Sequence, residues 1–181
     1  MKRTILGGLL LACAGTASLH AQTRVYLAGG VTFPQGSFGD RAYAGWHGLA
    51  TLNLSSPTQV YGLRFDVDYN RFGTSTETPV SPAAYGGARF TTTSGTLNLT
   101  YRLPMTNSAF SPYVITGLGV YVTDCSGAAG CGSSAHYGWN IGAGTKFYLF
   151  GLQGFLEGRF NRTGFRGAPV HYFPITLGLT L

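Results

Sequence analysis

The sequence is short of charged residues and contains no long hydrophobic run. Only 10% of its 181 residues are charged, whereas about 25% are charged in an average soluble domain. No stretch of about 20 consecutive apolar residues occurs, which excludes helices that span a membrane. Glycine (28 residues) and aromatic residues (14%) are abundant instead. Little charge, no long apolar run and many aromatics are expected of strands that face lipid.

Basic residues outnumber acidic residues, with 12 against 6. They are spread along the chain instead of gathering in one segment, so their excess does not indicate a nucleic-acid-binding patch. We therefore expect no nucleic-acid partner.

The N-terminus has the features of a secretory signal peptide. Lys2 and Arg3 supply a positive start, and residues 5–15 form an uncharged, mostly apolar run. Small residues follow, and we expect cleavage after Ala21. The apolar run is too short to cross about 30 Å of hydrocarbon as a helix, which argues against a membrane anchor. The mature chain, residues 22–181, has the length of one domain.

Cysteine is scarce, with three residues in the whole chain. Cys13 lies in the signal peptide, and lipoprotein processing there is an alternative, although Leu11 is atypical for that motif. Cys125 and Cys131 remain, in a Ser/Gly/Ala stretch. Because an exported protein meets an oxidising compartment, we expect a disulfide between them. A metal site is the alternative, but two cysteines and one nearby histidine, His136, are few ligands for zinc.

Apolar and polar residues alternate in segment after segment, which is the period of a β-strand with two different faces. Glycine interrupts every candidate helix. Eight segments show the alternation, and they are residues 24–33, 45–54, 59–72, 87–103, 112–123, 136–149, 152–162 and 171–181. The expected fold is all-β, an eight-stranded antiparallel up-and-down transmembrane β-barrel.

The connections between these segments alternate in length. Those after the second, fourth and sixth segments are short, and those after the first, third, fifth and seventh are longer, the last of them spanning residues 163–170. Outer-membrane barrels combine short periplasmic turns with longer external loops, so the pattern places both termini in the periplasm. An even number of strands also closes the barrel without an unpaired edge.

Alternation alone does not say which face is buried. The apolar face points inward in a soluble, lipocalin-like barrel and outward in a membrane barrel. Leu and Val lie between aromatic residues near the strand ends, which is typical of the two aromatic girdles of a membrane barrel. The expected girdle residues are Tyr69, Phe72, Tyr101, Tyr113, Tyr121, Tyr137, Trp139, Phe147, Tyr148 and Phe173. The outward facing is therefore preferred, and the lipocalin-like binder stays as an alternative.

Four stretches carry a resemblance to a known family, and they are residues 24–30, 111–113, 139–144 and 174–181. Together with the signal peptide, they resemble the small outer-membrane β-barrel domain family of the OmpA/OmpX type, over essentially all of the mature chain. No single stretch is specific, but the combination is. The resemblance implies an integral protein of the bacterial outer membrane, in contact with its lipid, with a structural or surface-interaction role.

The last strand carries the expected assembly signal. An apolar residue occurs at every second position to the end of the chain, at Phe173, Ile175, Leu177, Leu179 and Leu181. In the family that the chain resembles, this pattern is recognised by the barrel assembly machinery, and the final residue is commonly aromatic. Leu181 departs from that pattern.

If the apolar face points outward, the opposite face fills the lumen with polar side chains. We expect a salt-bridged network there, formed by Arg64, Asp66, Asp68, Arg102, Lys146, Glu157 and Arg159. Arg64 and Arg102 lie on neighbouring strands and are expected to compete for the same acids. A water-filled pore is the alternative, but an eight-stranded barrel is only wide enough for its own side chains.

No catalytic site is expected. Some small outer-membrane barrels modify lipid A, and the deacylase type carries a His-x-Ser pair, but glycine follows His136 and Tyr137 where that serine would be. Ser133 and Ser134 precede the histidine on an expected loop. Asp66 and Asp68 share a face, which fits acid/base work but fits a charge network more simply. His47 and His171 lack evident partners, and neither a Gly-x-Ser-x-Gly elbow nor a phosphate loop is present.

Three classes of function therefore stay open: a structural or surface-interaction barrel, a lipid A- or phospholipid-modifying enzyme, and a soluble periplasmic binding barrel. The first is preferred, with no cofactor and with an unidentified external ligand that contacts long loops such as residues 73–86. A closed barrel needs no partner to satisfy its edges, so we expect a monomer.

Overall fold

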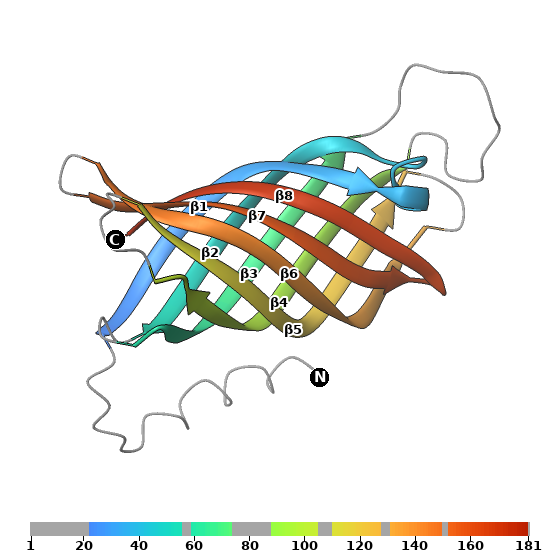
Figure 1. The fold of residues 1–181 in the computed structure, drawn as a ribbon. Helices are drawn as coiled ribbons and strands as arrows, with labels where there is room; N and C mark the ends of the chain where they lie inside the picture. The colour runs from blue at the N-terminus through green and yellow to red at the C-terminus, as the bar shows by residue number, and fades with distance from the viewer. Residues whose placement is uncertain are drawn as a thin grey trace, which may run out of the picture.

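The computed structural model describes residues 22–55, 59–73, 88–104, 110–127, 131–149 and 152–180. These residues form one closed antiparallel β-barrel (Figure 1). Its strands are β1 (Gln22–Gln35), β2 (Tyr43–Ser55), β3 (Tyr61–Gly73), β4 (Arg89–Arg102), β5 (Phe110–Ser126), β6 (Ser133–Leu149), β7 (Leu152–Phe165) and β8 (Ala168–Thr180). The predicted eight-stranded up-and-down fold is confirmed. The predicted signal peptide lies outside the described residues.

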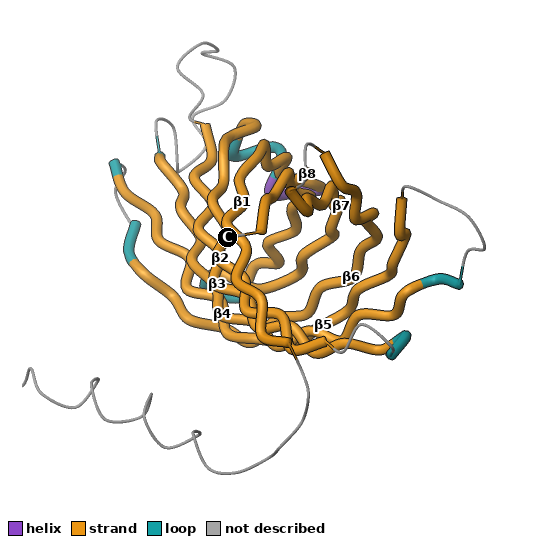
Figure 2. The backbone as a smooth tube through the Cα atoms, turned by 90° about the vertical axis from the view of Figure 1, so that its left-hand side faces the viewer, coloured by secondary structure: helices purple, strands orange, loops and turns teal. Residues whose placement is uncertain are grey.

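Each strand pairs with its neighbours in sequence, and β1 also pairs with β8 to close the sheet. The closing ladder runs from Tyr26 opposite Thr180 to Gln35 opposite His171. Figure 2 looks into the barrel from the end at which β8 finishes. Within the described residues no strand edge is left unpaired, so the backbone N–H and C=O groups are satisfied inside the sheet, as a bilayer interior requires.

We call the two ends of the barrel the terminal end and the loop end. The terminal end holds the start of β1, the finish of β8 and the connections β2–β3, β4–β5 and β6–β7 (Figure 1). The loop end holds the other four connections and a short 3-10 helix, η1 (Gly36–Phe38). The longest interval between strands, from Gly73 to Arg89, is at the loop end, as predicted.

The connection between β7 and β8 contradicts the prediction of a longer loop over residues 163–170. It consists of Arg166 and Gly167 alone. Both have a positive φ, 47° and 83°, which is the combination found in a two-residue type I′ hairpin. Glycine adopts this conformation without steric cost, so the two strands continue almost to their tip.

The apolar face of the barrel points outward, as predicted. On β3, Leu63, Phe65 and Val67 are 41%, 45% and 46% exposed, whereas Arg64 and Asp66 between them are 3% and 1% exposed. This facing is the reverse of that in a lipocalin-like soluble barrel. Among the described residues, no helix is long and apolar enough to cross a membrane.

Aromatic rings lie on the outer surface near both ends. Tyr61 and Tyr101 pack together at the terminal end, with ring centroids 5.1 Å apart. Trp46 and Tyr69 do the same near the loop end, at 5.6 Å. These pairs flank a band of exposed Leu, Val, Ile and Phe side chains, which is the arrangement of two interfacial girdles.

Three of the predicted girdle residues are buried in the lumen instead, and a fourth, Tyr148, lines a cavity at the terminal end of the lumen. Phe72, Tyr113 and Tyr121 are only 2%, 3% and 0% exposed. The girdle prediction was wrong for them because it used only nearness to a strand end. It ignored parity, that is, whether a residue lies at an inward or an outward position of the alternating strand. Phe72, for example, has the same parity as Asn70, which points into the lumen.

Candidate functional site

The inward side chains of β3 divide the lumen into layers. From the terminal end to the loop end they are Arg64, Asp66, Asp68, Asn70 and Phe72, all of them buried. The lumen therefore passes from a cation to carboxylates, then to an amide and finally to an aromatic ring. Inward residues of the other strands complete each layer.

Four charged side chains form a closed ring in the lumen, which we call the ion quartet. Arg64 binds Glu157 of β7 through two hydrogen bonds of 2.9 Å and binds Asp66 through Nε at 2.9 Å. Arg159 completes the ring, because its Nη2 lies 3.0 Å from Asp66 Oδ2 and also contacts Glu157. All four side chains are buried, and two positive charges balance two negative ones.

Neutral donors bind the carboxylates of the ion quartet. The Tyr113 hydroxyl donates to Glu157 Oε2 at 2.7 Å, and Asn98 Nδ2 donates to Asp66 Oδ2 at 3.0 Å. The Thr51 hydroxyl also donates to Asp66. Buried carboxylates have lost their hydration, and these bonds replace part of it. The quartet and its donors link β2, β3, β4, β5 and β7 across the lumen.

This arrangement is better suited to linking the strands and blocking the lumen than to acid/base chemistry. Asp66 and Glu157 are each bound by both arginines and by at least one neutral donor. Asp68, the other acid weighed for an acid/base pair, accepts a 2.7 Å bond from Asn70 and stands outside the quartet.

Arg102 and Lys146 belong to a different part of the lumen. Both line a cavity of about 170 Å³ at the terminal end. Arg64 shares the carboxylates of Asp66 and Glu157 with Arg159, a partner that the sequence did not single out for them. Arg102 is the last residue of β4, lies opposite Tyr113 and is exposed, so it sits at the mouth of the barrel.

A buried cluster of aromatic side chains, which we call the aromatic cap, fills the loop end. Its rings are those of Phe38, Phe72, Phe90, Tyr121, Phe165 and Tyr172. Phe38 of η1 packs edge-on against Phe72 and Phe90, at centroid distances of 4.9 and 5.4 Å. This cap was not predicted from the sequence. The available signal was that Phe72 shares the parity of the lumen-facing polar residues of its strand.

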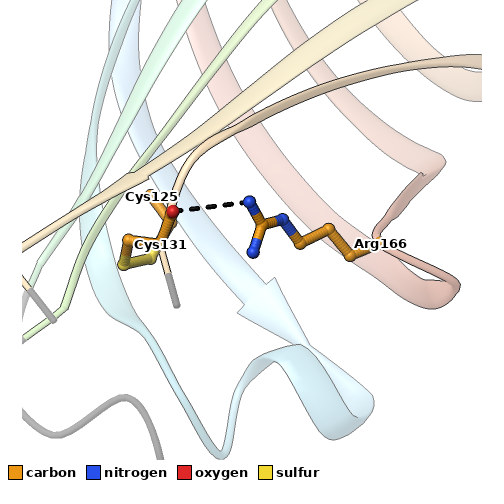
Figure 3. Close-up of a disulfide and its surroundings, with 3 residues drawn as sticks. All are labelled: Cys125, Cys131 and Arg166. Carbon is orange, nitrogen blue, oxygen red and sulfur yellow. Dashed lines mark hydrogen bonds between the residues drawn. A yellow bond between two sulfur atoms is a disulfide. The ribbon is translucent and has the colours of Figure 1, made fainter. Parts of the chain in front are cut away.

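The predicted disulfide between Cys125 and Cys131 is confirmed, with Cα atoms 4.8 Å apart (Figure 3). Cys125 is part of the buried cluster of the aromatic cap, and Cys131 packs against that cluster. Arg166 Nη2 donates to the Cys131 carbonyl oxygen at 3.4 Å, which joins the β7–β8 turn to the β5–β6 connection. Because the two sulfur atoms are bonded to each other, they do not bind a metal.

The residues weighed for catalysis include one contact that the sequence did not predict. Ser134 lies on β6, not on a loop, and its Oγ is 2.7 Å from His136 Nε2. Both are half-buried inward positions. Across the described ranges, no ion pair joins His136 to a carboxylate. His47 is buried beside the Thr176 hydroxyl at 2.9 Å, and the ring of His171 packs against an aromatic ring.

The residues of the expected assembly signal share one face of β8. Ile175, Leu177 and Leu179 are 41%, 56% and 47% exposed on the outer surface. Phe173 is half-buried on the same face, and Leu181 lies outside the described residues.

No family profile matches the chain, and no curated protein matches it. Solved structures do match. The crystal structure of Neisserial surface protein A aligns with a TM-score of 0.64 at 16% identity, over 88% of this chain and 96% of that chain. The outer membrane enzyme PagL aligns with a TM-score of 0.54 at 17% identity, over 86% and 97%. The N-terminal β-barrel domain of Pseudomonas aeruginosa OprF aligns with a TM-score of 0.52 at 14% identity, over 89% and 99%.

Likeness at these identities establishes the fold and not the activity. One of the three matched proteins is an enzyme by its description and two are not so described. The chain has the closed eight-stranded β-barrel fold of small bacterial outer-membrane proteins.

Proposed function

We propose that the protein is an integral outer-membrane β-barrel protein with a structural or surface-interaction role, and that its own side chains close its lumen. The facing of the barrel carries this proposal. Large apolar side chains such as Leu118 (70% exposed) and Leu177 (56% exposed) cover the outside, while charged side chains lie inside. A continuous apolar surface of this kind is unfavourable in water and suits hydrocarbon. The same facing argues against the soluble binding barrel.

Tryptophan and arginine positions support contact with outer-membrane lipid. Trp46 lies opposite Arg71 in the β2–β3 ladder, and Trp139 lies opposite Arg162 in the β6–β7 ladder. Arg89 is a third outward arginine, and all three arginines lie toward the loop end. Tryptophan favours the membrane–water interface, and arginine favours anionic head groups. These residues therefore suit the head-group layer at the loop end.

The orientation follows from the connections. Bacterial outer-membrane barrels keep their short turns in the periplasm and their longer loops outside. With the terminal end in the periplasm, η1, the end of β3 at Gly73 and the start of β4 at Arg89 face the exterior. Residues 73–86, the predicted contact for an external ligand, lie largely outside the described residues.

The filled lumen argues for a structural or surface role over transport. The ion quartet blocks the lumen with salt bridges, and the aromatic cap fills it at the loop end. An ion or solute would have to break several of these contacts to pass. We therefore propose that the barrel does not conduct in its resting state.

Export and assembly complete the proposal. The chain is exported by a signal peptide cleaved after Ala21 and is inserted by the barrel assembly machinery, which recognises the outward apolar series of β8. Since β1 and β8 pair with each other, the barrel needs no second copy to cover an edge, and it acts as a monomer.

One observation favours a second candidate, a lipid A- or phospholipid-modifying enzyme. Ser134 Oγ and His136 Nε2 are 2.7 Å apart, which is the reach of a nucleophile and its base. Both side chains face the lumen and not the lipid, which makes this candidate the weaker one. If the protein is such an enzyme, its overexpression should shift the mass of lipid A or phospholipid. The shift should be lost in both Ser134→Ala and His136→Ala. Unchanged lipid masses would support the non-enzymatic proposal.

Surface labelling tests the preferred proposal. In a variant without other cysteines, Ser37→Cys in η1 and Val60→Cys in the β2–β3 connection place one thiol at each end of the barrel. A membrane-impermeant maleimide is expected to label Ser37→Cys in intact cells and Val60→Cys only after the outer membrane is permeabilised. Both variants should stay in the membrane after an alkaline carbonate wash. Recovery from the soluble periplasm, or the reverse labelling, would contradict the proposal.

A further inference from the structure

The terminal end of the lumen is a cavity with an excess of positive charge. The space of about 170 Å³ is lined by Arg24, Arg64, Arg102 and Lys146, and no Asp or Glu is among the described residues that line it. Arg64 is neutralised by the carboxylates of the ion quartet. Three further positive charges line the cavity, and the described part of its wall contains no carboxylate.

These three cations come from different walls of the barrel. Arg102 of β4 lies opposite Tyr113, and Lys146 of β6 lies opposite Ser111, so both flank β5. Arg24 belongs to β1, which pairs with β2 and β8 and not with these strands. A group bound in the cavity would therefore meet cations from more than one side.

Hydrogen bonds and ring contacts fix the lining. Arg24 Nη1 donates to Gln153 Oε1 at 2.6 Å, and Gln153 Nε2 donates to the Tyr148 hydroxyl at 2.8 Å. The Lys146 ammonium lies 5.9 Å from the ring centroid of Tyr113, whose hydroxyl is bound to the ion quartet. A lining that is already positioned loses less conformational freedom when a ligand binds.

Neither the head groups of the bilayer nor an ion pair with a described carboxylate accounts for the charge of Lys146. Lys146 points into the lumen, so it does not reach head groups around the barrel as the outward Arg71 and Arg162 do. In the described part of the chain, no carboxylate forms an ion pair with Lys146. Like charges gathered in a partly enclosed space repel one another, so the lining favours an anion.

We propose that this cavity, the terminal vestibule, binds a small soluble phosphate-bearing anion of two or more negative charges, of the pyrophosphate type. Guanidinium groups bind phosphate oxygens through paired hydrogen bonds, and lysine adds a compact charge. The cavity is several times larger than the share of about 30 Å³ that one water molecule takes, so it has room for a group of several heavy atoms. The existence of the site depends only on the closed barrel. Entry of the anion from the periplasm rests on the proposed function, which places the terminal end in the periplasm.

Titration calorimetry of the mature protein in zwitterionic detergent, with sodium pyrophosphate, tests this proposal. We expect saturable one-to-one binding that weakens as sodium chloride is added. Lys146→Gln and Arg102→Gln should each weaken binding about tenfold or more, because each removes one charge-assisted contact. Arg71→Gln, which removes an outward arginine near the loop end, is the matched control and should bind as the unmodified protein does.

Thermal unfolding gives a second readout that does not depend on heats of binding. Pyrophosphate should raise the unfolding temperature of the unmodified protein and leave that of Lys146→Gln almost unchanged, since a ligand stabilises only the state that binds it. Absence of saturable binding, or equal loss of affinity in Arg71→Gln, would overturn the proposal. Heat-dependent gel mobility checks that each variant is folded.

A final arm distinguishes the two sources of such a phosphate. If phosphatidylglycerol added to the micelle leaves pyrophosphate binding unchanged, the site takes a soluble anion, as proposed. If phosphatidylglycerol competes with pyrophosphate, the site binds the phosphate of a lipid head group, and the proposal of a soluble ligand is overturned. Because these measurements are made in detergent, they are independent of the labelling result in cells.

Discussion

Replacing Glu157 by Gln should destabilise the barrel strongly, because it unbalances the ion quartet. The substitution keeps the size of the side chain, so no cavity forms. It removes the carboxylate that accepts two hydrogen bonds from Arg64 and also binds Arg159. Asp66 is then the one carboxylate of the quartet left for two buried guanidinium groups, which leaves one positive charge of the quartet without its partner. Breaking a buried ion pair in this way costs about 3–5 kcal/mol.

The assay is equilibrium unfolding by urea of protein folded into lipid vesicles, followed by tryptophan fluorescence. Asp40→Asn is the matched control, because it removes an exposed carboxylate at the loop end and should change the free energy of unfolding by less than about 0.5 kcal/mol.

A second substitution separates charge balance from simple loss of contacts. Glu157→Gln combined with Arg159→Gln removes one charge of each sign and leaves the neutral Arg64–Asp66 pair. The double variant should be more stable than the sum of the two single effects predicts, with a coupling energy of about 1–3 kcal/mol. An unfolding free energy of Glu157→Gln equal to that of the unmodified protein, or strictly additive effects, would refute the reasoning.

Three further predictions concern the loop end and the packing of the sheet, all measured by the same unfolding assay. Replacing Cys125 and Cys131 by Ser should cost on the order of 2 kcal/mol, and reducing agent should lower the stability of the unmodified protein equally. Phe38→Ala removes a buried ring of the aromatic cap and should cost roughly 3 kcal/mol. Gly142→Ala would place a Cβ atom 2.3 Å from a carbonyl oxygen of β7 and should cost about 1–3 kcal/mol, whereas Gly48→Ala meets nothing within 4 Å and should be tolerated.

Much of the fold could be predicted because the relevant signals are local. When apolar and polar residues alternate along a strand, the sequence itself shows which residues share each face. Residues 59–72 therefore predicted both the lumen side and the lipid side of β3. The disulfide was equally accessible, because Cys125 and Cys131 are close in sequence and the chain was expected to be exported.

The partners within the lumen could not be predicted, because they depend on height along the barrel axis. Alternation places Arg64, Arg102 and Arg159 on the same inward face, but the stagger between strands decides which of them meet. Arg159 reaches the level of Asp66, whereas Arg102 lies at the mouth of the barrel. The pairing of β3 with β7 across the lumen joins strands that are not neighbours in the sheet.

The tight turn and the aromatic cap were missed for different reasons. Arg166 adopts a positive φ that is uncommon for a residue with a side chain, so residues 163–170 resembled a longer loop. Toward the loop end, the inward residues of the strands change from polar at the level of the ion quartet to aromatic in the cap. A rule that expects every residue on one face of a strand to have the same polarity fails here.

The central claim is that this chain forms a closed barrel whose apolar face meets lipid. Gel mobility of the membrane-extracted protein, compared before and after boiling in detergent, tests it most directly. We expect two positions, because a closed barrel with a braced lumen resists the detergent until it is heated. A single position in both samples, together with recovery of the protein from the soluble periplasmic fraction, would contradict the account.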